Sequence, residues 1–183
     1  MSLSFVFLVV VGLVGIASGS DVIKVNSVEF GELEFIPLGN FSTTGSNGRI
    51  EEIYWFTTSR ELVADNANKI CESLGTGAKA AALLTPEINV AAKSFLDSQD
   101  IPNAWTSGQD FVTNGAFFWR TQTRNIPFTY EDFEKVAPFP NPNCQCVSIE
   151  RIKLPGCDPN LCKGNYKWFE KPCSEKKRLL CQL

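Results

Sequence analysis

The chain contains no histidine among its 183 residues. Histidine is the usual general base, a common zinc ligand and the side chain whose charge changes near neutral pH. Its absence argues against hydrolases that use a histidine base and against cysteine nucleophiles that histidine activates. The adjacent acids Glu131 and Asp132 remain as candidate catalytic groups, but acids in a loop are usually solvated surface. We therefore expect that the protein is not an enzyme.

Positive charge and long apolar segments are also scarce. The net charge is -3 and the pI is about 5.1, which gives no positive field for nucleic acid. One apolar run, ending at Ile16, is shorter than the ~20 residues that span a bilayer. It is followed by the small residues Ala17-Ser18-Gly19-Ser20, a pattern typical of a cleaved signal peptide. We expect residues 1–20 to be a signal peptide and the mature protein to be secreted and extracellular.

The seven cysteines are unevenly distributed. Six of them lie between Asn141 and Cys181, and Cys71 alone lies outside that segment. Secretion makes disulfides the default state, so Cys71 needs a partner, and the obvious one is near the end of the chain. A zinc site built from four thiolates is a competing interpretation, which secretion disfavours.

Residues 21–49 show no strong periodicity and are expected to form an N-terminal arm or loop. Residues 21–35 are mildly acidic, which is compatible with a first strand or a loose arm. Residues 39–48 are rich in Gly, Ser, Thr and Asn, so a loop is expected there. That stretch contains Asn40-Phe41-Ser42, an acceptor sequence for N-glycosylation, and Asn40 is the predicted glycosylation site.

The remaining residues, 50–183, predict one α+β domain. Helical spacing of apolar residues predicts a helix over 63–74 and a second one after Thr85-Pro86-Glu87, whose threonine is a good N-cap. Residues 120–142 have no period and four prolines, and predict a long structured loop. Strands are predicted at residues 50–57, 103–108, 116–119, 146–149, 166–168 and 179–181. Two helices with short antiparallel strands are typical of the α+β class.

A set of separated residues over about 50–183 stands in a specific order and spacing: Ala67, Cys71, Leu74-Gly75, Glu87, Trp105-Thr106-Ser107-Gly108, Gly115, Phe118-Trp119, Pro142-Asn143, Cys146-Val147, Trp168, Cys173 and Cys181. This order and spacing resemble those of a C-type lectin-like domain, and the residue types are most similar to those of the secreted insect members. The resemblance implies two helices on small antiparallel sheets with a long loop region that carries the ligand site. It also implies the disulfides Cys71–Cys181 and Cys146–Cys173.

The residues that would hold calcium in such a domain are largely replaced. Family members that bind sugar hold the ion through a Glu-Pro-Asn type triplet, an acid two positions before the cysteine that corresponds to Cys146, and a Trp-Asn-Asp triplet. Here the first triplet reads Asn141-Pro142-Asn143, the acid position is Cys144, and the last triplet reads Trp168-Phe169-Glu170. One carboxylate stands where the family has three, although calcium needs several hard oxygens. Calcium is therefore a doubtful cofactor, with Asn141, Asn143 and Glu170 as its candidate ligands.

Three cysteines lie outside the implied pairs. Cys157 and Cys162 flank a short turn and would form a small bridged loop, which leaves Cys144 free or available for an intermolecular disulfide. Alternatively Cys144 pairs with Cys157 or Cys162 and another cysteine is left over. A homodimer linked through Cys144 follows from the first arrangement.

We therefore expect a secreted carbohydrate-recognition protein that binds an extracellular glycan or glycoprotein, without nucleic acid or a membrane span. Asn141, Asn143, Phe169 and Glu170 are the candidate ligand-binding residues. The aromatic residues Phe139 and Tyr166 are further candidates for stacking on a sugar face. The alternative is a calcium-independent, protein-binding or disulfide-dimerised lectin-like module that does not bind sugar.

Overall fold

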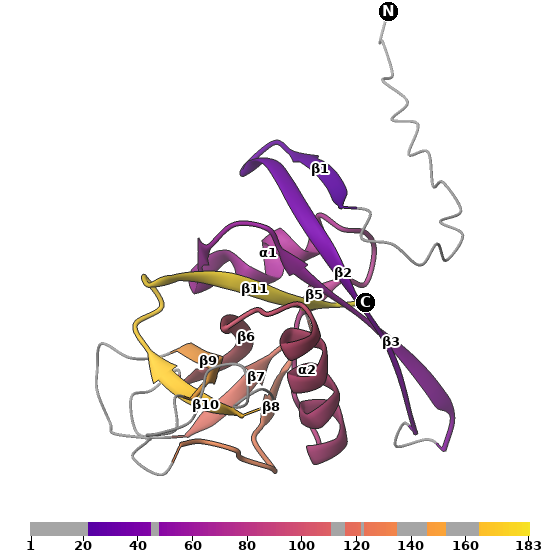
Figure 1. Ribbon diagram of the computed structural model, residues 1–183, viewed down its shortest axis with the longest axis vertical. Helices are drawn as coiled ribbons and strands as arrows, with labels where there is room; N and C mark the ends of the chain where they lie inside the picture. Colours follow the sequence, from indigo (N-terminus) through magenta and orange to yellow (C-terminus); the bar gives the residue numbers. More distant parts are fainter. Residues whose placement is uncertain (1–21, 45–47, 111–115, 122, 135–145, 153–164) are drawn as a thin grey trace, which may run out of the picture.

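The protein is a mixed α/β chain in which two short helices pack against a sheet-rich core (Figure 1). A computed structural model describes residues 22–44, 48–110, 116–121, 123–134, 146–152 and 165–183. The helical segments are a 3-10 turn at Ala64–Asn66, α1 at Ala67–Glu72 and α2 at Pro86–Ser98. The strands are β1 Ile23–Ser27, β2 Gly31–Thr44, β3 Ile50–Thr58, β4 Leu62–Val63, β5 Lys79–Ala80, β6 Asn103–Asp110, β7 Phe117–Arg120, β8 Asn125–Pro127, β9 Cys146–Arg151, β10 Tyr166–Lys171 and β11 Lys176–Gln182. None of the helices in these ranges is long and apolar enough to cross a bilayer.

Strand β11 joins the two halves of the sheet. It pairs antiparallel with β3 on one side and parallel with β6 on the other, and its flanks also pair with the short strands β4 and β5. Beyond β6 the sheet continues through β7 to β8, while β9 pairs with both β6 and β10. In Figure 1 β11 crosses the middle of the molecule, between the β1–β3 strands and the β6–β10 strands. The C-terminal strand thus connects the N-terminal strands to the part of the sheet that contains β10.

The N-terminal segment is more regular than its composition predicts. β1 and β2 form an antiparallel hairpin, and β2 pairs with β3 as far as Thr44↔Ile50. The predicted loop over residues 39–48 is wrong between Gly39 and Thr44, which belong to β2. Leu33 and Phe35 alternate with more exposed residues and are fully buried, as expected for a strand with one face on a core. The Gly/Ser/Thr-rich residues form a strand because β3 supplies their backbone hydrogen-bond partners.

Both helices lie where the apolar spacing predicts them, although the first is shorter. Helix α2 begins after Thr85, whose Oγ1 accepts a hydrogen bond from the Ile88 N–H at 3.3 Å. Its apolar stripe, which includes Ala92 and Leu96, faces the core. Helix α1 spans six residues, because the chain at its predicted start pairs with β11 as β4. Cys71 lies on the buried face of α1, as predicted.

Two glycines occupy places where a side chain would collide with a neighbour. Gly39 has φ +137° at an irregularity of the β2–β3 ladder, and a Cβ there would lie 2.5 Å from the ring of Phe95 on α2. Gly108 on β6 faces Val147 on β9, and its Cβ would lie 2.8 Å from the Val147 Cβ. Glycine therefore permits β2 to approach α2 and β6 to approach β9.

Two disulfides fix the architecture, and both are the pairings that the resemblance implies. Cys71 on α1 is bonded to Cys181 on β11 across 110 residues, and Cys146 at the start of β9 is bonded to Cys173 across 27 residues. Three of these cysteines are buried in one apolar cluster together with Trp105. The crosslinks thus tie α1 to the C-terminal strand and the start of β9 to the chain after β10.

Candidate ligand-binding site

An aromatic cluster around Trp168 anchors the chain that leaves β8. Trp168 on β10 is fully buried, and four rings contact it edge-on with centroids between 5.2 and 5.7 Å away. Three of these rings follow β8, in a stretch that the sequence predicts as part of a long loop. Edge-to-face contacts of this kind add to the stabilisation from apolar burial. The four rings belong to Trp119, Phe128, Tyr130 and Phe133.

The predicted long loop therefore begins with ordered structure. Its first residues include the short strand β8, which pairs with β7 and corrects the prediction of an irregular chain from residue 120. The next residues pair with β10: the Trp168 N–H donates to the Asp132 carbonyl at 2.9 Å, and the Glu134 N–H donates to the Trp168 carbonyl at 3.1 Å. The part of the loop up to Glu134 is thus attached directly to the strand that carries Phe169 and Glu170.

Asp132 is the polar anchor of this segment. Its carboxylate accepts hydrogen bonds from the amines of Lys93 and Lys167 and from the Asn89 amide at 2.7 Å, and its side chain is only 10% exposed. Burial alone would raise the pKa of Asp132, but the donors from Lys167, Lys93 and Asn89 together hold it below its ordinary value. The expectation that the acids at 131–132 are solvated surface is wrong for Asp132.

Asn89 extends this network into the core. It lies on α2 and is fully buried, and its Oδ1 accepts a hydrogen bond from Trp168 Nε1 at 2.9 Å. Its amide nitrogen donates to Asp132 and, at 3.1 Å, to the Tyr130 hydroxyl. A buried amide with all these hydrogen bonds fixes the relative positions of three elements: α2, β10 and the segment that follows β8.

The two predicted ligand residues on β10 lie on opposite faces of the strand. Successive side chains of a strand alternate, so Glu170 shares the face of Trp168, while Phe169 shares the face of Lys167 and Lys171. Phe169 is partly exposed, and the Lys171 amine lies 5.5 Å from the centre of its ring. A ligand lying on one face of β10 therefore reaches one of the two predicted side chains.

Glu170 lies in a partly buried, negatively charged position. Glu170 pairs with Val147 on β9, and Gly108 on β6 faces the same valine. Because side chains two residues apart lie on the same face of a strand, Asp110 lies on the face of β6 on which Gly108 meets Val147. Burial, and then the negative charge of Asp110, raise the pKa of Glu170 from 4.5 to about 7. Near neutral pH the Glu170 carboxyl is therefore a mixture of the protonated and ionised forms.

No protein-family model matches the chain, and no curated protein matches it by sequence. Human lithostathine superposes with a TM-score of 0.57 at 19% identity, covering 72% of this chain and 83% of lithostathine. The C-type lectin CEL-I from Cucumaria echinata superposes with a TM-score of 0.56 at 12% identity, covering 71% and 89%. The fold is that of a C-type lectin-like domain.

A third structural match, a calcium-independent type II antifreeze protein, has the same fold at a TM-score of 0.53 and 18% identity, covering 72% of this chain and 85% of that one. Identities this low show the fold alone. The C-type lectin-like fold thus defines the scaffold of this chain, and the properties of its site depend on its own residues.

Of the three candidate calcium ligands, Asn141, Asn143 and Glu170, only Glu170 lies within the described residues, so calcium binding stays a prediction that these residues do not test. Calcium takes six to eight oxygen ligands, and the neighbouring Phe169 offers no side-chain oxygen. The predicted signal peptide, Phe139 and three of the cysteines also lie outside the described residues: Cys144, Cys157 and Cys162.

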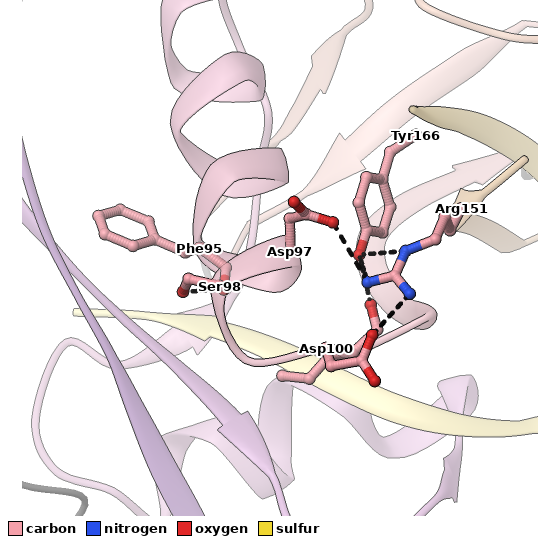
Figure 2. Close-up of polar contacts among 7 residues, drawn as sticks. Phe95, Asp97, Ser98, Asp100, Arg151 and Tyr166 are labelled. Atoms are coloured by element: carbon pink, nitrogen blue, oxygen red, sulfur yellow. Dashed lines mark hydrogen bonds and ion pairs between the residues drawn. The ribbon is translucent and has the colours of Figure 1, made fainter. Parts of the chain in front are cut away.

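Tyr166, which the sequence offered as a stacking residue, is not available for a ligand. Its ring is buried, its hydroxyl donates to the Ile101 carbonyl at 2.8 Å, and the Arg151 guanidinium donates to that hydroxyl at 2.9 Å. Arg151 also pairs with Asp97 and Asp100 at the end of α2 (Figure 2). Burial raises the pKa of Tyr166, so its hydroxyl remains protonated. This cluster fixes the end of α2 to β9 and β10.

An apolar groove of about 570 Å³ lies between β2 and the outer face of α2. Phe41 of β2 and Phe95 of α2 are partly buried in it, while Val90 is 63% exposed. The predicted glycosylation site, Asn40, is exposed on β2 and pairs across the ladder with Tyr54. The groove and the β10 surface are separate features of the domain.

Proposed function

We propose that the protein is secreted and recognises an extracellular glycan or glycoprotein through the surface of β10. The C-type lectin-like fold supports this proposal, and so does the attachment of the segment after β8 to β10 through Trp168 and Asp132. Secretion is supported by the sequence of residues 1–20 and by the two disulfides, which form in oxidising compartments. Asn40 is exposed, as an N-glycosylation site must be.

The observation that carries the proposal is the partly exposed ring of Phe169, which the Lys171 amine approaches to 5.5 Å. Aromatic rings stack on the apolar face of a sugar, and Lys167 and Lys171 lie on the same side of β10 as Phe169. Recognition through this face requires no metal ion. The calcium-independent antifreeze protein supports this step, because the same fold exists there without calcium dependence.

A glycan array, probed with the purified mature protein in calcium and then in EDTA, tests the proposal. We expect binding to a defined set of glycans that survives chelation, and we expect Phe169→Ala to weaken it about threefold to tenfold, the range that one stacked ring contributes. Tyr54→Ala, which removes an exposed ring from β3, serves as the matched control and should leave binding unchanged. Binding that EDTA abolishes, or that Phe169→Ala leaves intact, would contradict the proposed mode of recognition.

The alternative function is calcium-independent protein binding, with or without dimerisation through Cys144. The apolar groove between β2 and α2 favours it, because exposed apolar surface with aromatic residues is typical of protein interfaces. An array without any bound glycan, together with a dimer on a non-reducing gel that Cys144→Ser converts to a monomer, would favour this alternative.

A further inference from the structure

One edge of β2 has no strand beside it over residues 36–44. β1 pairs with β2 only from Gly31 to Phe35, and Val22, the residue before β1, is 43% exposed. Beyond Phe35, β2 has a strand partner on its β3 side alone within the described part of the chain. In Figure 1 these ends of β2 and β3 extend from the sheet beside α2. The backbone groups on the outer edge can therefore pair with an added strand.

The apolar groove of about 570 Å³ lies next to this edge. Its apolar side chains come from both elements, and Val90 is 63% exposed, so a ligand that covers it removes apolar surface from water. The groove is open and extended, which suits a row of side chains. Its apolar lining consists of Phe41 on β2 and of Pro86, Val90, Ala91 and Phe95 on α2.

The two faces of this part of β2 differ. Gly39 faces the Phe95 ring, and Phe41 lines the groove, so Asn40 between them projects to the opposite face. A glycan on Asn40, the predicted acceptor, would extend away from the groove. The groove can therefore hold a ligand whether or not Asn40 is glycosylated.

The groove carries negative charge. Among the described residues that line it, Glu87 is the one charged group. Hydrogen bonds from its own backbone N–H and from the Thr85 side chain hold the pKa of Glu87 below its ordinary value, so the carboxylate is ionised at neutral pH. Lys93, also on α2, is paired with Asp132 and does not line the groove. A positively charged group on the ligand would therefore complement this site.

We propose that the groove binds an extended peptide segment of a partner protein, which adds as a strand to the outer edge of β2. Alternate side chains of an added strand point the same way, so every second residue of the peptide is apolar and enters the groove. A lysine or arginine of the peptide faces Glu87. This binding goes beyond glycan recognition at β10 and depends on neither Phe169 nor calcium.

The first test is to pan a displayed library of random octapeptides on the purified mature protein. We expect enriched peptides with apolar residues at alternate positions and at least one lysine or arginine. A synthetic peptide of the enriched sequence is then titrated by fluorescence anisotropy. A library that yields no enriched peptides, or yields acidic ones without the alternation, would overturn the proposal.

Variants of the groove locate the binding. Val90→Lys should weaken the peptide about tenfold or more, because a charge replaces an apolar contact. Lysine forms helices better than valine, so α2 should persist, which circular dichroism checks. Val28→Lys is the matched control, since Val28 is fully exposed in the turn between β1 and β2 and does not line the groove. An equal effect of the two substitutions would place the peptide elsewhere and contradict the proposal.

A second pair of variants tests the charge. Glu87→Gln should weaken the peptide about twofold to fivefold, the range of an exposed ion pair, and should reduce the salt dependence of binding. Glu61→Gln removes an exposed acid outside the groove and should change neither quantity. If Glu87→Gln leaves both the affinity and its salt dependence unchanged, the basic residue of the ligand is refuted.

N-methylated peptides test the strand pairing. Successive N–H groups of a strand point to opposite edges, so an added strand uses only every second one. Two versions of the peptide are made, each methylated on one alternate set of amides. We expect one version to lose binding and the other to retain it, whereas equal affinities of the two versions would rule out pairing with β2.

Two controls separate this proposal from its alternatives. Phe169→Ala should leave the peptide affinity unchanged, so the glycan proposal and the peptide proposal fail or succeed independently. Gel filtration of the mature protein should show no self-association that Val90→Lys removes. Self-association that this substitution abolishes would assign the groove to a second copy of the chain and would overturn the proposed partner.

Discussion

Replacing Asp132 with asparagine tests how the segment after β8 is held on β10. The carboxylate is 10% exposed and accepts hydrogen bonds from Lys93, Lys167 and Asn89. Breaking a buried ion pair by removing one partner costs about 3–5 kcal/mol. Lys167 is 39% exposed and can be resolvated, and the asparagine oxygen still accepts hydrogen bonds, so we expect Asp132→Asn to cost about 2–3 kcal/mol.

The pH dependence of this loss identifies its cause. The folded pKa of Asp132 lies below its unfolded value, so the stabilisation is fully present above the unfolded pKa of ~3.9 and is lost as pH falls through the folded pKa. The difference between wild type and Asp132→Asn should therefore be constant from pH 5 to 7 and shrink below about pH 4.

Urea denaturation with both disulfides intact measures this difference, and Glu131→Gln is the matched control. Glu131 is the exposed neighbour of Asp132, and its substitution should change the free energy of unfolding by less than about 0.5 kcal/mol. If Asp132→Asn is no more destabilising than Glu131→Gln at pH 7, the anchoring role is refuted. A loss that persists unchanged at pH 3 would refute the electrostatic explanation.

Three further predictions concern stability. Replacing both Cys71 and Cys181 with alanine should cost roughly 4–5 kcal/mol in the chain-entropy model, measured by denaturant unfolding; a cost below 1 kcal/mol would contradict that model here. Gly108→Ala should cost about 1–3 kcal/mol, because the new methyl group collides with Val147; an unchanged Tm would show that β6 and β9 can separate freely. Glu170→Gln should raise Tm at pH 8 but not at pH 4.5. The folded pKa of Glu170 is raised to about 7, so the folded state loses stability as pH rises from 4.5 through 7, and glutamine avoids this loss. An effect of the substitution that does not change with pH would contradict the raised pKa.

The sequence predicts well those features that depend on local spacing. The N-cap at Thr85 and the apolar stripe of α2 follow from residues a few positions apart, and the structure confirms both. The pairing of Cys71 with Cys181 was predicted from the family resemblance, and the structure confirms it. The strand prediction at residues 50–57 succeeded for the same local reason, since branched and aromatic residues cluster there.

Features that depend on distant partners were missed. Residues 39–44 have the composition of a loop and form a strand because β3 pairs with them. Asp132 has the sequence context of a surface acid and is buried because Lys93, 39 residues earlier, and Lys167, 35 residues later, both meet it. The role of Asn89 was missed for the same reason. One polar residue in an amphipathic helix does not indicate that its side chain accepts a hydrogen bond from the Trp168 indole.

The central claim is that this C-type lectin-like domain recognises a glycan through Phe169 without calcium. The most direct measurement is a pair of calorimetric titrations with a glycan identified on the array, one in calcium and one in EDTA. We predict dissociation constants that agree within about twofold in the two buffers. A loss of affinity of tenfold or more in EDTA would contradict the claim and would make calcium an essential part of the site.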